Sequence, residues 1–248
     1  MLSILVVILG FGLVIGLHEL AHMLTAKAFE VNVLKFSFGF GPRLLGYVYK
    51  GTSHELRLLP LGGFVQFAGE DPLDNIKGGF FSVPWYKRSL IALAGPVMNL
   101  LLGLALIFTL LLFNHWPILL AVKKTFNISW FVISKTLEWI GGIFTAQSHM
   151  SDMAGPIMVT KLMVTSLKES VTQFFFLLSI VSLSLGLFNL FPIPGLDGGH
   201  VALYTVEGIL NRKLSDKVYL VWNYLGLTLL GLLMVFIIFG DITKLIKG

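Results

Sequence analysis

Three ionisable side chains stand close together in an otherwise apolar stretch near the start of the chain. His18, Glu19 and His22 form the pattern H-E-x-x-H. On a helix, residues i and i+4 lie on one face, so both imidazoles can bind one zinc ion with the carboxylate beside it. A catalytic zinc ion has three protein ligands and keeps its fourth position for water. The pattern therefore predicts metal-dependent hydrolysis and requires a third ligand from elsewhere in the chain.

The strongest candidate for the third ligand is Asp197, in the segment FNLFPIPGLDGGH at 188–200. It is the only charged residue between Glu169 and Glu207. The prolines and glycines around it interrupt any continuous helix, and irregular backbone at membrane depth is tolerated where it is buried in protein or lines a cavity. His200 is a competing third ligand that ranks below Asp197.

Each of these residues also has a structural interpretation. A histidine in a membrane span can be a structural residue with satisfied hydrogen bonds, and an acid at the end of a span can be an ordinary loop residue. Two histidines and a glutamate inside one span, however, need a compensating partner, and a metal ion supplies one.

The elements that must position these residues are membrane helices. The chain is 56% hydrophobic and only 12% charged, whereas soluble domains carry about 25% charged residues. Four apolar tracts exceed the roughly 20 residues that cross a bilayer. They lie at about 1–29, 89–113, 171–196 and 218–240. The sequence thus predicts a single α-helical integral membrane domain over 1–248, with about four transmembrane helices. We expect the first tract to be retained, because it lacks the basic start of a removable signal peptide.

Two connecting segments have patterns of their own. Residues 31–68 show partial alternation of apolar and polar residues with Gly and Pro between them, which predicts a membrane-associated β-hairpin or short sheet. Residues 114–170 include an amphipathic helical pattern near 128–146. This helix can lie at the membrane interface or pack on the protein.

Charge predicts the orientation of the chain and one class of partner to exclude. Lysine and arginine are most frequent in residues 27–88 and recur in a short loop at 201–217, which predicts that both segments are cytoplasmic and both termini are outside. The motif at the end of the first tract then lies toward the cytoplasmic side. The net charge of +5 has no basic run or aromatic-interleaved basic patch, so we expect no nucleic acid partner. The sequence does not indicate an oligomeric state.

Taken together, the motifs resemble the site-2 protease family of intramembrane zinc metalloproteases. H-E-L-A-H is followed by N-L-F-P-I-P-G-L-D-G, which meets each fixed position of the family pattern N-x-x-P-x-P-x-L-D-G. The segments GFGPRL at 39–44, LPLGGFVQF at 59–67 and AGPVMN at 94–99, with the run from 154 to 200, extend the likeness to the bacterial regulator-of-sigma-E protease branch. That branch usually carries PDZ domains between its second and third spans, and the roughly 60 residues here are too few for one. Either the chain lacks them naturally or they have been removed.

The resemblance implies a zinc endopeptidase of the bacterial inner membrane, with Zn²⁺ on His18, His22 and Asp197. Glu19 would be the general base for a zinc-activated water. The implied partners are the lipid bilayer and the transmembrane helix of a single-span substrate, of the anti-sigma factor or remnant signal peptide type. Asn189 would bind the substrate backbone, with a structural role in the broken helix as its alternative.

A helical substrate must be extended before its amides can be attacked, and an exposed strand could pair with it. Leu61, Gly62 and Gly63 are our candidates for that edge, and a plain structural hairpin is the alternative. Two other functions compete with proteolysis. A metal transporter also uses membrane His and Asp, but the second and fourth tracts have almost no polar groups. A non-catalytic protein that binds transmembrane helices is disfavoured by the intact H-E-x-x-H.

Overall fold

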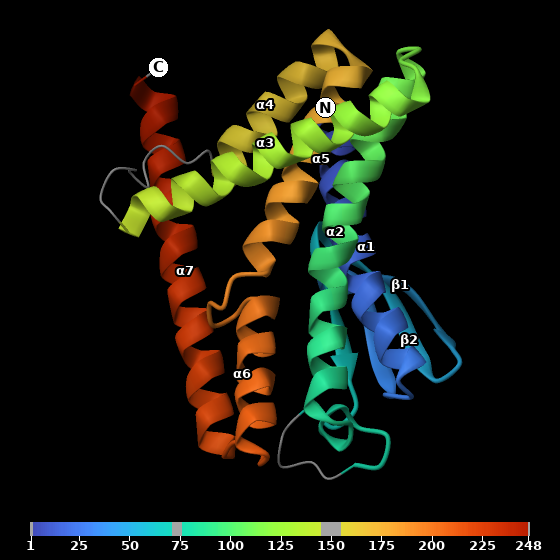
Figure 1. The fold of residues 1–248 in the computed structure, drawn as a ribbon, viewed down its shortest axis with the longest axis vertical. Coiled ribbons are helices and arrows are strands. Elements are labelled where there is room, and N and C mark those ends of the chain that lie inside the picture. The colour runs from blue at the N-terminus through green and yellow to red at the C-terminus, as the bar shows by residue number, and fades with distance from the viewer. Residues whose placement is uncertain (1, 71–75, 145–154, 248) are drawn as a thin grey trace. The chain divides into compact units, whose positions relative to one another are not determined.

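The computed structural model describes residues 2–70, 76–144 and 155–247 (Figure 1). The chain divides into two compact units. The first unit comprises Met1–Val7, Leu100–Leu187 and Thr228–Gly248, and the second comprises Ile8–Asn99 and Phe188–Leu227. Every candidate site residue named above falls in the second unit.

Among the described residues, four helices are long and apolar enough to cross a membrane, which confirms the predicted fold class. They are α1 (Leu2–Ala28), α2 (Trp85–Phe113), α5 (Val171–Asn189) and α7 (Asp216–Lys247). Helices suit this environment because their backbone groups are paired within the segment. The third span ends at Asn189 rather than at the predicted 196, because the proline- and glycine-rich stretch that follows cannot continue a helix.

After that interruption a further helix begins. Helix α6 (Asp197–Leu210) occupies most of the predicted 201–217 loop, so that prediction was wrong in its local structure. The helix buries Leu203, Tyr204 and Glu207, which share one face, and ends at Asn211 in the left-handed conformation.

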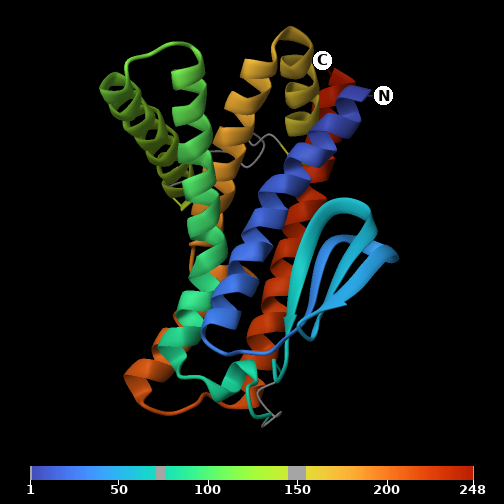
Figure 2. The ribbon, with the colours of Figure 1, turned by 90° about the vertical axis from the view of Figure 1, so that its right-hand side faces the viewer.

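The predicted β-rich segment forms two long antiparallel strands, β1 (Val33–Tyr49) and β2 (Thr52–Phe67). Both strands bend, so residues 35–38 have partners on two sides. Phe38, for example, is opposite both Leu56 and Gly63. Within the described residues, 63–67 therefore pairs along one side only and forms an edge. Figure 2 shows this sheet beside the second-unit part of α1, where the Phe38 ring packs against Gly12 and Gly16.

An aromatic core joins β2, α6 and α7 in the second unit. A short 3-10 helix, η1 (Phe80–Ser82), precedes α2. Its Phe80 stacks on Phe67 of β2 and meets Tyr204 of α6 edge-on, while Phe81 meets Tyr219 of α7. Burying these rings against one another links the sheet to three helices.

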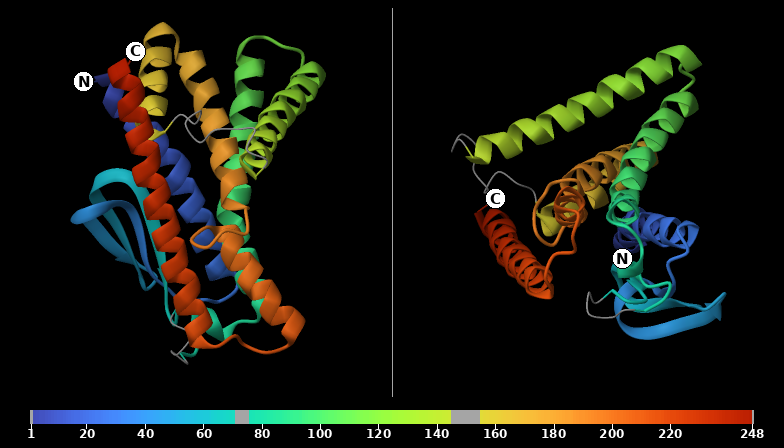
Figure 3. Two further views of the ribbon diagram at one scale, coloured as in Figure 1. Left: turned by 90° about the vertical axis from the view of Figure 1, so that its left-hand side faces the viewer. Right: turned by 60° about the horizontal axis from the view of Figure 1, so that its bottom comes forward.

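The first unit contains two helices that do not qualify as membrane spans, α3 (Ile118–Phe144) and α4 (Pro156–Glu169). Helix α3 leaves the end of α2 at a steep angle (Figure 3). It buries the small residues Ala121, Thr125 and Ser129 and exposes large ones such as Phe126 and Trp130. This arrangement suits a helix with one face on protein and another in lipid, and its place at the membrane interface stays a prediction.

Candidate metal centre

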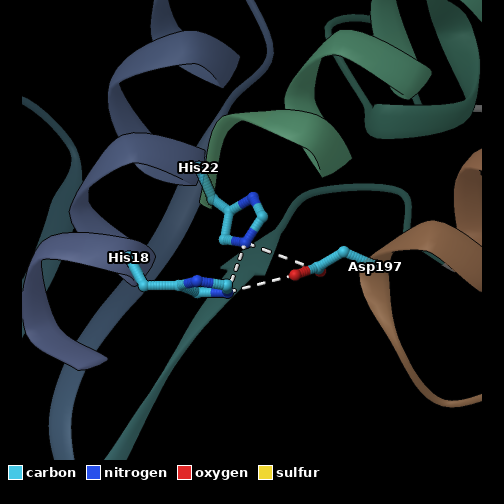
Figure 4. A group of neighbouring side chains, drawn as sticks. All are labelled: His18, His22 and Asp197. Atoms are coloured by element: carbon cyan, nitrogen blue, oxygen red, sulfur yellow. Dashed lines mark hydrogen bonds and ion pairs between the residues drawn. The ribbon is translucent and has the colours of Figure 1, made fainter. Parts of the chain in front are cut away.

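Three ligand atoms converge between α1 and the start of α6. His18 Nε2 lies 3.1 Å from His22 Nε2 and 3.1 Å from Asp197 Oδ2, and His22 Nε2 lies 3.5 Å from Asp197 Oδ1. Figure 4 shows the two imidazoles and the carboxylate pointing toward one common point. His18 and His22 are 7% and 8% exposed, so little water reaches their rings. The i, i+4 spacing that predicted a shared face thus brings both rings to one carboxylate 175 residues later.

The outer ring nitrogens have partners that fix which atom is free for a metal. His22 Nδ1 lies 2.7 Å from the carbonyl oxygen of Ile91 on α2, so Nδ1 must carry the hydrogen and Nε2 is left with its lone pair. His18 Nδ1 lies 3.1 Å from the side-chain amide nitrogen of Asn99, also on α2. The same amide turned over would accept a hydrogen bond from Nδ1–H, which is the tautomer that leaves Nε2 free for a metal.

This geometry fits a zinc ion. With both Nδ1 atoms protonated, both Nε2 atoms and the Asp197 oxygens are acceptors, and a cation between them would offset the repulsion of their lone pairs. Zinc bonds to nitrogen and oxygen are about 2.0 to 2.2 Å long, which sets the ligand atoms of a tetrahedron about 3.3 to 3.6 Å apart. The observed separations agree with that spacing within a few tenths of an ångström.

Helix α2 has no side chain at Gly95, the position that lies against the two imidazole rings. A Cβ at Gly95 of α2 would lie 2.2 Å from His22 Nε2 and 2.6 Å from His18 Nε2. Any other residue would therefore occupy the space that the ligand atoms need. Glycine in the middle of a helix costs about 0.5 to 1 kcal/mol relative to alanine, and here it permits the approach of both rings.

The loop before α6 determines where Asp197 lies. Two glycines follow Asp197, and a Cβ at Gly198 or Gly199 would lie 2.2 Å from the Leu190 carbonyl oxygen or 2.1 Å from that of Ile193. The first turn of α6 therefore packs directly on the backbone of the preceding loop. The Asp197 carboxylate faces the two Nε2 atoms, at 3.1 Å from His18 and 3.5 Å from His22. Asp197 is thus a carboxylate ready to bind a cation.

Glu19 faces a cavity of about 240 Å³ next to the three ligands. The Val65 backbone, on the edge of the sheet, lies within hydrogen-bonding reach of its carboxylate. Asp197 and His22 line the same cavity, and so does His200, whose pKa is lowered by burial. His200 is not part of the group of ligand atoms that converge, which keeps it a cavity residue rather than the third ligand.

The remaining predicted residues lie at different distances from this centre. A Cβ at Gly63 would lie 3.1 Å from Glu19 Cγ, so the predicted strand passes directly beside the carboxylate. Gly62 packs under the Phe40 ring, and the Leu61 backbone continues the same strand. Asn189 is the last residue of α5, and the cavity described above does not include it.

Sequence reasoning did not assign roles to four residues of α2 that support the site. Ile91, Gly95 and Asn99 contact the histidines, and Arg88 pairs with Glu207 of α6. The motif AGPVMN at 94–99 was a usable signal, since a glycine and an asparagine interrupt an apolar span there. The role of each depends on a tertiary contact that spacing does not reveal.

Comparisons with known proteins found a matching family model and several relatives. The model of Peptidase family M50 matches residues 6–233, and no PDZ domain was matched. A Clostridium acetobutylicum protein named "Putative zinc metalloprotease CA_C1796" is 24% identical, covering 97% of each chain. A Campylobacter jejuni protein named "Putative zinc metalloprotease Cj1068" is 23% identical, covering 99% of this chain and 94% of its own. These alignments span 329 and 351 positions, which exceeds the 248 residues here, so the relatives contain segments that this chain lacks.

Proposed function

We propose that this chain, which belongs to Peptidase family M50, cleaves single-span membrane proteins within or near their spans. Membership makes it a membrane-embedded zinc metalloprotease, as the sequence predicted. The observation that carries the proposal is the convergence of Asp197 with His18 and His22, beside Glu19. The two histidines and Glu19 are on α1, a helix long enough to cross a membrane. The substrates we propose are of the anti-sigma factor or remnant signal peptide type.

The three converging residues would hold zinc, and the remaining chemistry falls to the chain. When bound, zinc lowers the pKa of water to about 7 and polarises a carbonyl group. Glu19 takes the proton of the attacking water as the C–O bond forms at the scissile carbonyl. It then delivers that proton to the amide nitrogen as the C–N bond breaks. The cavity beside Glu19 provides room for water at a site that is otherwise buried.

The sheet edge at 63–67 is the proposed docking strand for an extended substrate. It pairs along one side only among the described residues, and Gly63 and Val65 approach Glu19. An extended peptide that adds to this edge would have its backbone beside the carboxylate. The Leu61–Gly63 stretch leads into this edge on the same strand, so we propose that it also contacts substrate. For Asn189, a substrate-binding role is proposed from the motif at 189–198 alone. We also propose that the chain lies in the bacterial inner membrane with this site toward the cytoplasm, because Lys and Arg concentrate in residues 27–88.

The edge can be tested by cross-linking, because the chain has no native cysteine. Gln66→Cys, at an exposed edge position, would be combined with Glu19→Gln and with cysteines scanned through a model substrate. Strand addition predicts disulfides at every second substrate position, and Val48→Cys on the other arm of the sheet is the control. Disulfides at every third or fourth position would show instead that the substrate docks as a helix.

The catalytic assignment is tested with purified enzyme in lipid vesicles and a single-span substrate. Glu19→Gln is expected to retain zinc and to lose cleavage by at least about 100-fold, as expected for removal of a general acid–base group. Cleavage at the wild-type rate with zinc still bound would exclude Glu19 as the base. If the wild-type protein binds zinc and cleaves nothing, a transporter or a helix-binding protein becomes the better account.

A further inference from the structure

One face of α2 contacts both halves of the metal centre. Arg88, Ile91, Gly95 and Asn99 follow one another at spacings of three or four residues, so they lie along a single stripe of the helix. Three of them contact the histidines of α1, as described above. The fourth, Arg88, contacts the helix that begins with Asp197.

Arg88 is held on α6 by several contacts at once. Its guanidinium lies 2.5 Å from Glu207 Oε2, and both residues are nearly inaccessible, at 2% and 3% exposure. The same guanidinium donates a hydrogen bond to the Tyr219 hydroxyl, at 3.3 Å, and stacks over the Tyr204 ring. The other oxygen of Glu207 accepts the backbone N–H of Leu214, at 2.7 Å. A charged pair with this many satisfied partners has little freedom to move.

We infer that the Arg88–Glu207 ion pair is a positioning device for Asp197. Glu207 and Asp197 are ten residues apart on α6, so fixing one end of this short helix fixes the other. The stripe on α2 then sets α6 and the histidines of α1 against one common surface. Metal ligands need placement within about 0.5 Å. The packing of Gly198 and Gly199 on the preceding loop fixes the start of α6, and the Arg88–Glu207 pair fixes the same helix near its other end. This inference rests on the proposed metal site.

The pair has a cost that stability alone does not explain. Buried ion pairs often contribute little to stability compared with packed apolar residues of similar size. The pair joins α2, which supports the histidines, to α6, which carries the third ligand, and so it specifies one position of α6 relative to α2. That position sets the geometry of the metal centre.

The test measures metal affinity in the Glu19→Gln protein, so it does not depend on proteolysis. Zinc affinity is titrated against a chelator, and cobalt substituted for zinc reports ligand geometry through its visible spectrum. Arg88→Gln and Glu207→Gln should each weaken zinc about 10- to 100-fold, the range for outer-shell partners of metal ligands. Arg88→Lys, which keeps the charge, should recover most of that affinity and the cobalt spectrum.

Two controls separate positioning from general destabilisation. Asp241→Asn removes a buried carboxylate interaction in the other unit and should lower the unfolding temperature without changing zinc affinity. In an Asp197→Ala background, Arg88→Gln should cause no further loss of zinc affinity, because the ligand that it positions is gone. Equal losses with and without Asp197, or unchanged affinity in both ion-pair variants, would overturn the inference. Absence of zinc binding in the wild type would instead reject the proposed metal site.

Discussion

Two aspartates, one in each unit, show how partners determine what a carboxylate does. Asp197 begins α6, yet its oxygens face two imidazole nitrogens rather than the N–H groups of its own helix. Asp241, near the end of α7, is only 1% exposed. It accepts the backbone N–H groups of Gly155, Ile157 and Met158, at 2.9 to 3.0 Å.

The difference lies in what satisfies the charge of each carboxylate. The N-terminus of α4 gives Asp241 three donors and a favourable helix dipole, so its charge is satisfied by the protein itself. The two ring nitrogens that face Asp197 have no hydrogen left to donate where Nδ1 carries the proton. Asp197, whose neighbours are acceptors like itself, is therefore the metal-ligand candidate of the two.

The largest predicted effect distinguishes these two residues directly. Asp197→Ala removes one of three ligands and should weaken zinc by more than the roughly 100-fold that loss of an outer-shell partner costs. Metal analysis of purified protein after equilibration with a chelator measures this loss. Asp241→Ala is the matched control and should retain zinc at the wild-type level. Zinc retained by Asp197→Ala would transfer the third-ligand role to another residue, with His200 as the first to test.

A smaller effect is expected when the space between the ligands is filled. Gly95→Ala places a methyl group 2.2 Å from His22 Nε2, so the imidazoles must move apart. We expect zinc affinity to fall at least about tenfold, measured by the same chelator competition. Gly231→Ala on α7 is the control, since a Cβ there meets nothing within 4 Å. If both alanine variants bind zinc equally, the close approach of α2 is not needed by the metal.

The smallest effect on the metal, and a clear one on stability, belongs to Asp241. Asp241→Ala leaves one buried and two partly buried N–H groups without their acceptor, which should cost about 2 to 5 kcal/mol of unfolding free energy. Asp241→Asn keeps one carbonyl oxygen and should lose less. Thermal unfolding in detergent, followed by circular dichroism, compares the two. A zinc affinity that falls in parallel with stability would contradict the separation of roles drawn here.

The sequence predicted the residues whose chemistry is written in spacing. The i, i+4 histidines, the acid in a broken span and the four apolar tracts are such features, because each is a pattern that can be recognised along a short stretch of sequence. Gly95, Arg88 and Asp241 could not be found in this way. A glycine in a span, a basic residue near its start and an acid near its end are common in membrane helices, and their roles here come from contacts 73 to 119 residues away.

Boundaries around the broken span were also beyond the sequence. Hydropathy continues through Phe191 and Leu196, so the third tract extends in sequence past the point where the helix ends at Asn189. Proline and glycine signalled a break but not its position. The start of α6 at Asp197 depends on the close contact of Gly198 and Gly199 with the preceding loop, which only the folded chain contains.

The central claim is that one zinc ion lies between His18, His22 and Asp197. It is tested most directly by anomalous diffraction at the zinc absorption edge, from crystals of the Glu19→Gln protein grown with zinc. We predict one strong anomalous peak about 2.0 to 2.2 Å from His18 Nε2, His22 Nε2 and an Asp197 oxygen. A peak elsewhere, or a zinc ion bound by both histidines with Asp197 turned away, would contradict it.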